Sequence, residues 1–414
     1  MSKTITLDLP KLGIQNITVD NAVARGAVTD AVNIDIADEG SFRSRPGLLV
    51  FFALQGIRTA YWSELHQGVF YHRNDGVYFT RMEGDETPIL PSGVINVSFA
   101  VYNDAVLVST RSDLVMVDED FNLHRSLGAP LGCYATASFD PESESDGLPE
   151  GRYDLAFTLR DIVTGEEGRA LVQSGLRVLS GGAISLSPYV PPAGTVLVVY
   201  ITDPDGAIFH QKLDSSVGGI PQTEIRSVGR GRTLDTLDVF PLAPGEHITW
   251  VGGRLFSTVA GITDKTWILE YSEPLRPLYS TGYNYIQFTG KRPRFLAKAG
   301  EWLFVGDDRG VWRINGSEPD TTKLLQVSDV PALMNSGFSV PADALPLPDL
   351  STNTELCAVW LTEGGAVAGL PEGSIKQLHS HLALNGDTIV TSTSYIINDG
   401  IPQLVFTTDR DSIQ

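Results

Sequence analysis

Three short acidic clusters are the first residues in this sequence whose types could do chemistry. They lie at 118–120, at Asp203 and Asp205, and at Asp307 and Asp308. Hydrolysis of a glycosidic bond needs two carboxylates placed across that bond. Each cluster lies in or beside a predicted turn, where Asp is favoured because its side chain bonds to nearby backbone. Turn formation is therefore the preferred interpretation, and the sequence around Asp205 is too short for a calcium loop.

Histidine offers one further candidate site. His379 and His381 are two residues apart, so on a strand both imidazoles point to one face and can reach one metal ion. A catalytic zinc needs a third protein ligand, and Asp387 is the nearest carboxylate in sequence. A pair of strand histidines on a polar face is the preferred interpretation. The sequence contains no Gly-x-Ser-x-Gly elbow and no phosphate-binding loop, so we expect no enzyme activity, no metal and no cofactor.

Arg226, Arg230 and Arg232 form the one basic cluster of the sequence. A flexible, solvated loop is the ordinary explanation for such a cluster. In a chain with a net charge of −20, a local cationic segment also suits a contact with an acidic neighbouring subunit. These three arginines are therefore the candidate inter-subunit contact, and an acidic loop such as 140–146 is the candidate counterpart.

The composition favours strands and disfavours tight binding of DNA. Charged residues make up 19% of the chain, and there are 41 Gly and 24 Pro, which is typical of all-β proteins with many turns. The net charge of −20 keeps a chain soluble, and it also suits a surface that DNA must pass without sticking. No apolar run is long enough to cross a membrane, and the first residues do not resemble a signal peptide. We therefore expect no membrane anchor and synthesis in the cytoplasm.

The two cysteines show no pattern that requires a zinc site or a disulfide. Cys133 and Cys357 are far apart in sequence and show no zinc-site spacing, so both are expected to be buried as small hydrophobic residues. Four tryptophans lie among strand-forming residues, and core packing is the preferred interpretation over a carbohydrate-binding platform. These are Trp250, Trp302, Trp312 and Trp360.

Apolar strands joined by short polar turns that end in Gly recur at both ends of the chain. The clearest hairpins are 69–79, 102–117, 301–314, 357–369 and the one that begins at Ser394. Recurrence at about 40 to 50 residues is typical of propeller modules, although a β-sandwich shows the same hairpin pattern. Helical periodicity is poor, and only 329–334 is consistent with a short helix.

The middle of the chain has a different composition. Residues 140–147 are acidic and rich in Ser, as in an exposed loop, and several short alternating strands follow them. We therefore expect an all-β fold in three segments. Residues 1–130 form the first part of a β-propeller, 131–243 an inserted β-sandwich of the fibronectin or immunoglobulin type, and 244–414 the second part of the propeller.

Several motifs together resemble a family of virion proteins. Within 31–47, an Asn-containing strand leads to the run Arg43-Ser44-Arg45-Pro46-Gly47. Farther along the chain come Gly253-Arg254-Leu255-Phe256, Tyr271-Ser272-Glu273-Pro274 and Gly310-Val311-Trp312-Arg313-Ile314. As a set they resemble the β-propeller nozzle and hub proteins in the tails of short-tailed phages. This chain is much shorter than those nozzles, which leaves its tier in a tail open.

The resemblance implies a structural subunit in the tail or neck of a virion. Such proteins form homo-oligomeric rings, usually hexamers, that serve as a conduit for genome ejection. The expected partners are further copies of the chain, other tail, neck or portal-adaptor proteins, and genomic DNA that passes without specific binding. Two other functions stay open at this stage. One is a glycan-binding or depolymerase-like receptor protein for the host surface, which would need an exposed cluster of aromatic residues and carboxylates, and the other is a cellular propeller scaffold.

Overall fold

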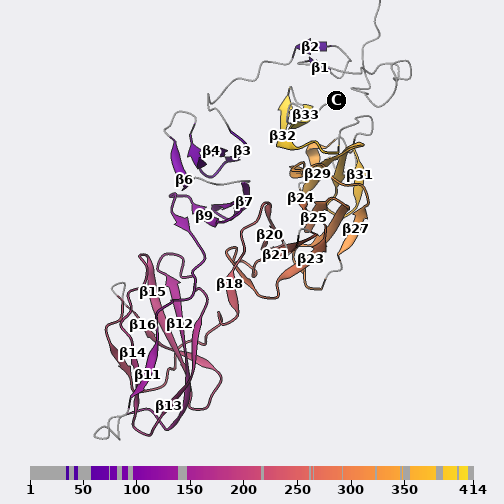
Figure 1. Ribbon diagram of the computed structural model, residues 1–414. Helices are drawn as coiled ribbons and strands as arrows, with labels where there is room; N and C mark the ends of the chain where they lie inside the picture. Colours follow the sequence, from indigo (N-terminus) through magenta and orange to yellow (C-terminus); the bar gives the residue numbers. More distant parts are fainter. Residues whose placement is uncertain are drawn as a thin grey trace, which may run out of the picture. The chain divides into compact units, whose positions relative to one another are not determined.

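The computed structural model places most of the chain (Figure 1). It describes residues 34–36, 42–44, 57–73, 75–81, 86–91, 97–138, 147–215, 219–260, 263, 265–290, 292–321, 324–345, 347, 355–378, 386–398 and 401–408. The chain divides into two compact units. Unit 1 takes its described residues from Met1–Leu123, Pro244–Leu269 and Ile286–Gln414, and unit 2 takes them from His124–Ala243 and Glu270–Tyr285.

Unit 1 is a series of small antiparallel sheets. Its described residues form five four-stranded sheets, in each of which the strands pair in chain order, and two two-stranded sheets. The four-stranded sheets are β3 (Thr59–Ser63), β4 (Gly68–Arg73), β5 (Gly76–Thr80) and β6 (Thr87–Pro91); β7 (Ser98–Tyr102), β8 (Ala105–Ser109), β9 (Leu114–Asp118) and β10 (Leu123–His124); β19 (Ile248–Val251), β20 (Arg254–Ala260), β21 (Thr266–Tyr271) and β23 (Tyr285–Thr289); β24 (Pro293–Ala299), β25 (Trp302–Asp307), β26 (Gly310–Asn315) and β27 (Leu325–Ser328); and β28 (Phe338–Pro341), β29 (Leu356–Thr362), β30 (Gly365–Gly369) and β31 (Ile375–Gln377). The two-stranded sheets are β1 (Ile34–Ile36) with β2 (Phe42–Ser44), and β32 (Val390–Asn398) with β33 (Ile401–Thr408).

Turn chemistry sets the tight connections within these sheets. The loop between β19 and β20 is only Gly252-Gly253, and both residues have positive φ, 59° and 79°. A two-residue hairpin loop with positive φ at both positions matches the right-handed twist of the flanking strands, and glycine adopts it without steric cost. The recurring pattern of apolar strands joined by turns that end in Gly therefore follows from the backbone conformation that these tight turns require.

Apolar side chains fill the spaces between neighbouring sheets of unit 1. Phe70 and Phe79 of the first sheet share one core cluster with Val106 and Val108 of the second. Farther along the chain, the sheet that begins with β24 shares a cluster with the sheet that begins with β28. At these two interfaces the unit is held together by apolar side chains from facing sheets.

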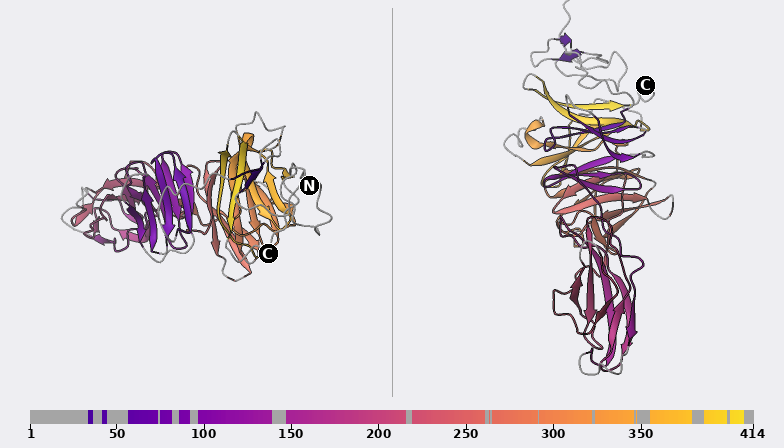
Figure 2. Two further views of the ribbon diagram at one scale, coloured as in Figure 1. Left: turned by 90° about the horizontal axis from the view of Figure 1, so that it is seen from above. Right: turned by 90° about the vertical axis from the view of Figure 1, so that its left-hand side faces the viewer.

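The first strands of these sheets meet one another. Strand β7 contacts β19, β19 contacts β24, β24 contacts β28, and β32 contacts both β28 and β3. Figure 2 shows the short sheets from two further directions. The all-β prediction is confirmed, and the multiple four-stranded antiparallel sheets are consistent with a β-propeller.

Unit 2 contains two main sheets, one of short strands and one that includes three long strands. One sheet orders β11 (Ala135–Ser138), β14 (Ala183–Leu186) and β17 (Thr223–Ile225), and the other orders β13 (Leu171–Val178), β12 (Gly151–Asp161), β15 (Thr195–Thr202) and β16 (Phe209–Asp214). A two-stranded sheet joins β18 (Val239–Pro241) to β22 (Tyr279–Thr281). Side chains from both main sheets, among them Phe157, Val199 and Ile184, form one core cluster.

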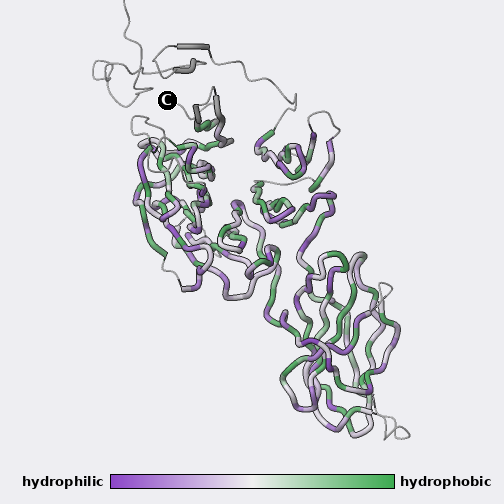
Figure 3. Tube along the Cα trace, turned by 180° about the vertical axis from the view of Figure 1, so that it is seen from behind, coloured by the Kyte–Doolittle hydropathy of each residue, from purple (hydrophilic) through white to green (hydrophobic). Residues whose placement is uncertain are grey.

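Strand β15 is the centre of unit 2. All eight of its residues are buried, so both faces of the strand are covered. Leu197, Val199 and Ile201 face the core between the two sheets, while Val198 and Tyr200 face a second cluster that includes Phe209 and Leu234. Figure 3 shows the hydropathy of each residue along the chain trace. The second face of β15 therefore needs a covering segment, and Leu234 brings one from beyond β17.

The structure confirms the predicted hairpins and contradicts the predicted short helix. The predicted hairpins correspond to β4–β5, β8–β9, β25–β26, β29–β30 and β32–β33. The possible short helix at 329–334 is wrong: Ala332 and Met334 form isolated β-bridges there, and the Leu333 amide donates to the Leu361 carbonyl at 2.7 Å. Within the described residues, the helix present is the three-residue 3-10 turn η3 (Ala342–Ala344).

Candidate functional sites

The basic segment lies along the edge of strand β16. The Gln211 amide donates to the Arg232 carbonyl at 2.8 Å, the Gly231 amide donates to the Gln211 carbonyl at 3.1 Å, and His210 forms a β-bridge with Thr233. These bonds pair an otherwise open sheet edge, which is a common way to block unwanted strand pairing. The segment is therefore anchored to unit 2 rather than a free, solvated loop.

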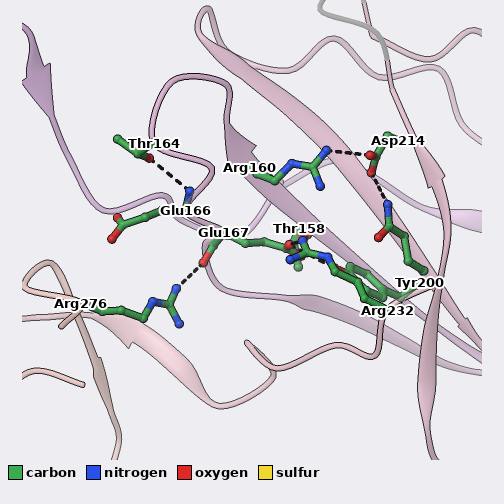
Figure 4. Close-up of polar contacts among 10 residues, drawn as sticks. Thr158, Arg160, Thr164, Glu166, Glu167, Tyr200, Asp214, Arg232 and Arg276 are labelled. Atoms are coloured by element: carbon green, nitrogen blue, oxygen red, sulfur yellow. Dashed lines mark hydrogen bonds and ion pairs between the residues drawn. The ribbon is translucent and has the colours of Figure 1, made fainter. Parts of the chain in front are cut away.

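Arg232 turns inward to a buried carboxylate. Its guanidinium forms an ion pair with Glu167, whose side chain is only 3% exposed. The Thr158 hydroxyl donates to the same carboxylate, and the Tyr200 hydroxyl donates to it at 3.0 Å (Figure 4). Burial raises the pKa of Tyr200, which keeps its hydroxyl protonated as a donor. A buried charge is tolerated when it is paired and hydrogen-bonded in this way.

Arg276 holds the backbone of the same residue. Its guanidinium donates to the Glu167 carbonyl at 2.7 Å and lies 4.7 Å from the centre of the Tyr279 ring (Figure 4). The Tyr279 hydroxyl in turn accepts a hydrogen bond from the Leu127 amide at 2.9 Å. The Glu167 hub, defined as Thr158, Glu167, Tyr200, Arg232 and Arg276, thus joins segments that are far apart in the sequence. Its carboxylate is occupied by protein donors, so the geometry fits a structural role and not a nucleophile or general base.

Neighbouring charges surround the hub. Burial raises the pKa of Glu166, while Arg276 opposes that rise and Asp161 adds to it. On the other side of β12, Arg160 pairs with Asp214 at 2.7 Å, and the Gln211 side chain donates to the same carboxylate at 2.7 Å (Figure 4). Cations here are largely matched by acids of the same unit.

The other two predicted arginines have different surroundings from Arg232. Arg226 pairs with Glu224 at 2.7 Å, and both side chains are partly exposed. Arg230 is exposed, and no hydrogen bond or ion pair joins it to another residue that the structure describes. The proposed counterpart loop at 140–146 lies outside the described residues. Arg232 is therefore committed to a carboxylate of its own unit, while Arg226 and Arg230 are at least partly exposed.

Unit 1 contains a cavity of about 410 Å³ between its first strands. It is lined by residues of β3, β7, β19, β24, β28 and β32, including Ser98, Thr249 and Ser339, and by Glu246 and His247 just before β19. Burial lowers the pKa of His247 to about 4, so its imidazole is neutral at neutral pH. Glu246 is paired with Arg292 at 2.9 Å. The lining offers mixed polar groups without an unpaired charge among those named.

The acidic clusters act as turn residues where they are described. Asp118 accepts hydrogen bonds from the amides of Asp120 and Asn122 at 3.0 and 2.8 Å, and Asp307 accepts one from the Arg309 amide at 2.6 Å. The third cluster also lies in a turn, where the Gly206 amide donates to the Asp203 carbonyl at 2.9 Å, so the turn interpretation is confirmed for all three. Within the described part of the chain, no group of three or more His, Cys, Asp or Glu is placed to hold a metal ion. His379 and His381 lie outside that part.

The two thiols and the tryptophans lie in apolar surroundings. Cys133 and Cys357 are free and buried, as predicted, and burial raises their pKa values to about 12 and about 11. Trp360 and Trp312 belong to the buried core, and Trp302 packs against the same cluster as Trp360. Among the helices that the structure describes, none is long and apolar enough to cross a membrane.

Sequence reasoning missed the Glu167 hub. Glu167, Thr158 and Tyr200 had no assigned role in the sequence analysis, which singled out only Arg232 of the hub. One signal was available in the sequence. Residues 195–202 form a strand that is apolar on both faces, and such a strand needs a covering segment on each side. Nothing in the spacing links Glu167 to Arg232 or Arg276, because only the tertiary fold makes them neighbours.

Comparison with known proteins gives distant likenesses of fold alone. No protein-family model matches the chain, and no curated protein matches its sequence. The WD40 domain of Neurospora crassa Pan2 covers 89% of this chain and 94% of its own length, at 8% identity and a TM-score of 0.32. BBS1N in complex with ARL6DN covers 87% of this chain and 95% of its own length, at 12% identity and a TM-score of 0.31. Kluyveromyces lactis Hsv2 covers 85% of this chain and 98% of its own length, at 5% identity and a TM-score of 0.28. At these scores the class of the protein, all-β with four-stranded sheets consistent with a β-propeller, rests on its own strand pairing.

Proposed function

We propose that this chain is a structural subunit of a phage tail or neck and forms a ring through which the genome leaves the particle. The observation that supports this most directly is the segmented architecture. The chain leaves a series of small four-stranded sheets after β10, builds a compact unit with two main sheets, and resumes the series at β19. The segments of the chain before and after unit 2 are the ones that resemble nozzle and hub proteins. The order of the sheets along the chain therefore agrees with that resemblance.

The detailed fold belongs to the same proposal. Unit 1 would be a β-propeller built from both ends of the chain, from segments 1–130 and 244–414. Unit 2 would be an inserted sandwich of the fibronectin or immunoglobulin type at 131–243. Its two main sheets share one core, as expected of a sandwich.

The charge balance suits a conduit for DNA. A chain with net charge −20 has few cations to hold phosphates, and those of the Glu167 hub are engaged by protein groups. DNA binding without sequence preference depends on Lys and Arg that neutralise phosphates. A ring of such subunits would let genomic DNA slide past without specific contacts.

Contacts between copies would use the arginines of the segment that reach the surface. Arg230, together with Arg226 and its surface partner Glu224, is the part of the predicted contact that can meet an acidic loop such as 140–146 of a neighbour. Arg232 is better left out, because its guanidinium is committed to Glu167 within the subunit. Other tail, neck or portal-adaptor proteins would bind the faces of the ring.

Electron microscopy of the purified full chain tests the proposal. We expect discrete rings with a central opening, most often sixfold. Double substitution of Arg226 and Arg230 by Ser should weaken ring formation most at low salt, where charge contacts are least screened. Lys298→Ser is a control that removes one partly exposed cation from unit 1. The proposal would be contradicted if the protein were a monomer in mature virions, or if the channel of the ring were lined by Lys and Arg.

A further inference from the structure

Two neighbouring turns of unit 2 carry large side chains that are exposed. Tyr283 and Tyr285, which follow β22, are 86% and 49% exposed, and Leu275, in the turn before β22, is 65% exposed. The other tyrosines of this segment, Tyr271 and Tyr279, are buried. Exposed tyrosines are typical of surfaces that bind a partner, because the ring supplies a large contact area and has little conformational freedom to lose.

Hydrogen bonds hold these two turns together. The Asn284 side chain is buried and donates to Glu273 Oε1 at 2.6 Å. The Tyr271 amide donates to the Asn284 carbonyl at 3.0 Å, and the Glu273 amide donates to the Tyr279 carbonyl at 2.8 Å. Because the backbone beneath the exposed side chains is fixed, little binding free energy is lost in ordering this surface.

The turn at Leu275 adopts a conformation that its sequence does not favour. The Arg276 amide donates to the Glu273 carbonyl at 3.1 Å, and Leu275, the third residue of this turn, has a φ of 57°. Glycine or asparagine is preferred at such a position, whereas a leucine there is strained. Arg276 holds the turn in place through its bond to the Glu167 carbonyl. A strained residue that also exposes an apolar side chain is a reason to look for a binding role.

Glu273 adds a carboxylate to this surface. Its side chain is half-buried, its Oε1 accepts the bond from Asn284, and no cation pairs with it among the residues that the structure describes. A guanidinium group binds where a carboxylate accepts its N–H groups and an aromatic ring covers its flat face. Glu273 and the two exposed tyrosines on either side of Asn284 offer both. We define Glu273, Leu275, Tyr283 and Tyr285 as the guanidinium site.

Unit 1 contains an occupied example of the same arrangement. The Arg73 guanidinium lies 4.3 Å from the centre of the Tyr78 ring. It also pairs with Asp75 at 2.9 Å and with Glu86 at 3.2 Å. A tyrosine ring beside a carboxylate is therefore an environment that this chain already uses to hold an arginine.

Arg230 is the cation that suits the guanidinium site. It is exposed, and no hydrogen bond or ion pair joins it to another residue that the structure describes. Arg232 and Arg226 have partners of their own in Glu167 and Glu224. Each chain carries a net charge of −20, so two copies repel each other unless opposite charges meet locally. A cation and a carboxylate that lack ionic partners within the described subunit provide such a meeting point.

We propose that the guanidinium site of one copy binds Arg230 of a second copy. Glu273 accepts its N–H groups, and Tyr283 and Tyr285 lie against its flat face. Leu275 packs along the aliphatic part of the same side chain. The two surfaces differ, as in the contacts of a cyclic ring. This inference rests on the proposed association of copies, and it gives Arg230 a described counterpart in place of the loop at 140–146.

Assembly of the purified full chain at low salt, measured by mass photometry, tests the site. Tyr283→Ser and Glu273→Gln should each raise the concentration needed for assembly by at least about tenfold, since each removes one of the two groups that hold the guanidinium. Glu273→Gln keeps an oxygen for Asn284 and lowers the repulsion between copies, so a weaker assembly of this variant does not come from net charge. Tyr134→Ser and Glu150→Gln change an exposed tyrosine and an exposed acid elsewhere in unit 2, and these controls should assemble as the parent does.

The outcomes separate this inference from the proposed ring. Rings in the parent that are unchanged in both variants would overturn the guanidinium site and leave the ring standing. Dimers in the parent that are lost in both variants would support the site and contradict the ring. A parent that stays monomeric would overturn both.

Cross-linking between copies provides a second readout. Two single variants, Thr233→Cys in the basic segment and Gly282→Cys beside the guanidinium site, are mixed, so that only a contact between copies can join them. An added Cβ at Gly282 meets its nearest ring carbon at 3.8 Å, which is an ordinary contact, and the two native thiols are buried. A short bismaleimide should join the two variants, and peptide mass spectrometry should identify the link. The control mixture pairs Thr233→Cys with Glu150→Cys, and a yield no higher than that of the control would contradict the proposal.

Discussion

The two units of this chain use different interiors. In unit 1, apolar side chains fill repeated interfaces between neighbouring sheets, as where Phe295, Phe304 and Trp360 meet. In unit 2, the core between two sheets is supplemented by one charged hub, in which Glu167 engages Arg232 and Arg276 from distant segments. Repeated apolar contacts distribute the free energy of folding over many residues. In the hub, the basic segment is held to unit 2 largely by the single ion pair of Arg232 with Glu167. The two units should therefore respond differently to substitution and to pH.

Removing a central ring from unit 1 should have the largest effect. Trp360 is fully buried between Phe295 and Phe304. Trp360→Ala should lower the free energy of unfolding by about 3–5 kcal/mol, because it removes buried area and leaves a cavity. Chemical denaturation measures this. Trp62→Ala is the control, since that side chain is 46% exposed, and it should cost less than about 1 kcal/mol. Equal losses for the two variants would show that the apolar interface is not what stabilises unit 1.

Breaking the hub should have the next largest effect. Arg232→Ser leaves the Glu167 carboxylate buried without its cation, and should cost about 1–3 kcal/mol, reduced from the value for a fully buried pair because Arg232 is 43% exposed. Arg226→Ser removes only a surface pair with Glu224 and should cost less than about 0.5 kcal/mol.

A double-mutant cycle with Glu167→Gln separates the pair from its surroundings. In the Glu167→Gln background the loss caused by Arg232→Ser should shrink, because the uncompensated charge is gone. The same loss in both backgrounds would show that Arg232 acts through packing alone.

Acidification should weaken unit 1 through His247. Burial lowers its pKa in the folded state to about 4, below the ordinary value of 6.5, so the unfolded chain binds a proton more readily. This contribution is complete above pH 6.5 and is lost as the pH falls toward 4. We expect a loss of about 1–2 kcal/mol over that range that is absent in His247→Gln, measured by denaturation at several pH values. Parallel pH profiles for the parent and the variant would argue against a buried neutral imidazole.

The smallest expected effect has the opposite sign and lies in unit 2. Burial raises the pKa of Glu166, so its ionised form is disfavoured in the folded state and its contribution is lost as the pH rises through the folded value. Glu166→Gln should therefore stabilise the protein at pH 7, by less than about 1 kcal/mol since the group is partly exposed. The gain should diminish at acidic pH. Asp154→Asn, a partly exposed acid of β12, is a control with no expected gain. A loss of stability in Glu166→Gln would show that the attraction of Arg276 outweighs burial.

Much of the local structure was predictable because its causes are local. Alternating apolar residues and Gly-containing turns identified hairpins such as β25–β26 and β29–β30 before any tertiary contact was known. The segment 329–334 was misjudged because pairing with Thr362 and Leu361 overrides its weak helical preference. The basic segment was judged by composition, which cannot show that one of its arginines turns inward.

The sequence by itself determined the all-β class, the position of the hairpins and the turn role of residues such as Asp118, because strand period and turn geometry depend on neighbours along the chain. Only the tertiary structure decided which buried groups meet. Glu167 and Arg232 meet because the segment that carries Arg232 covers one face of β15. The first strands of unit 1 surround a common cavity. Both contacts depend on how the sheets pack and not on spacing in the sequence.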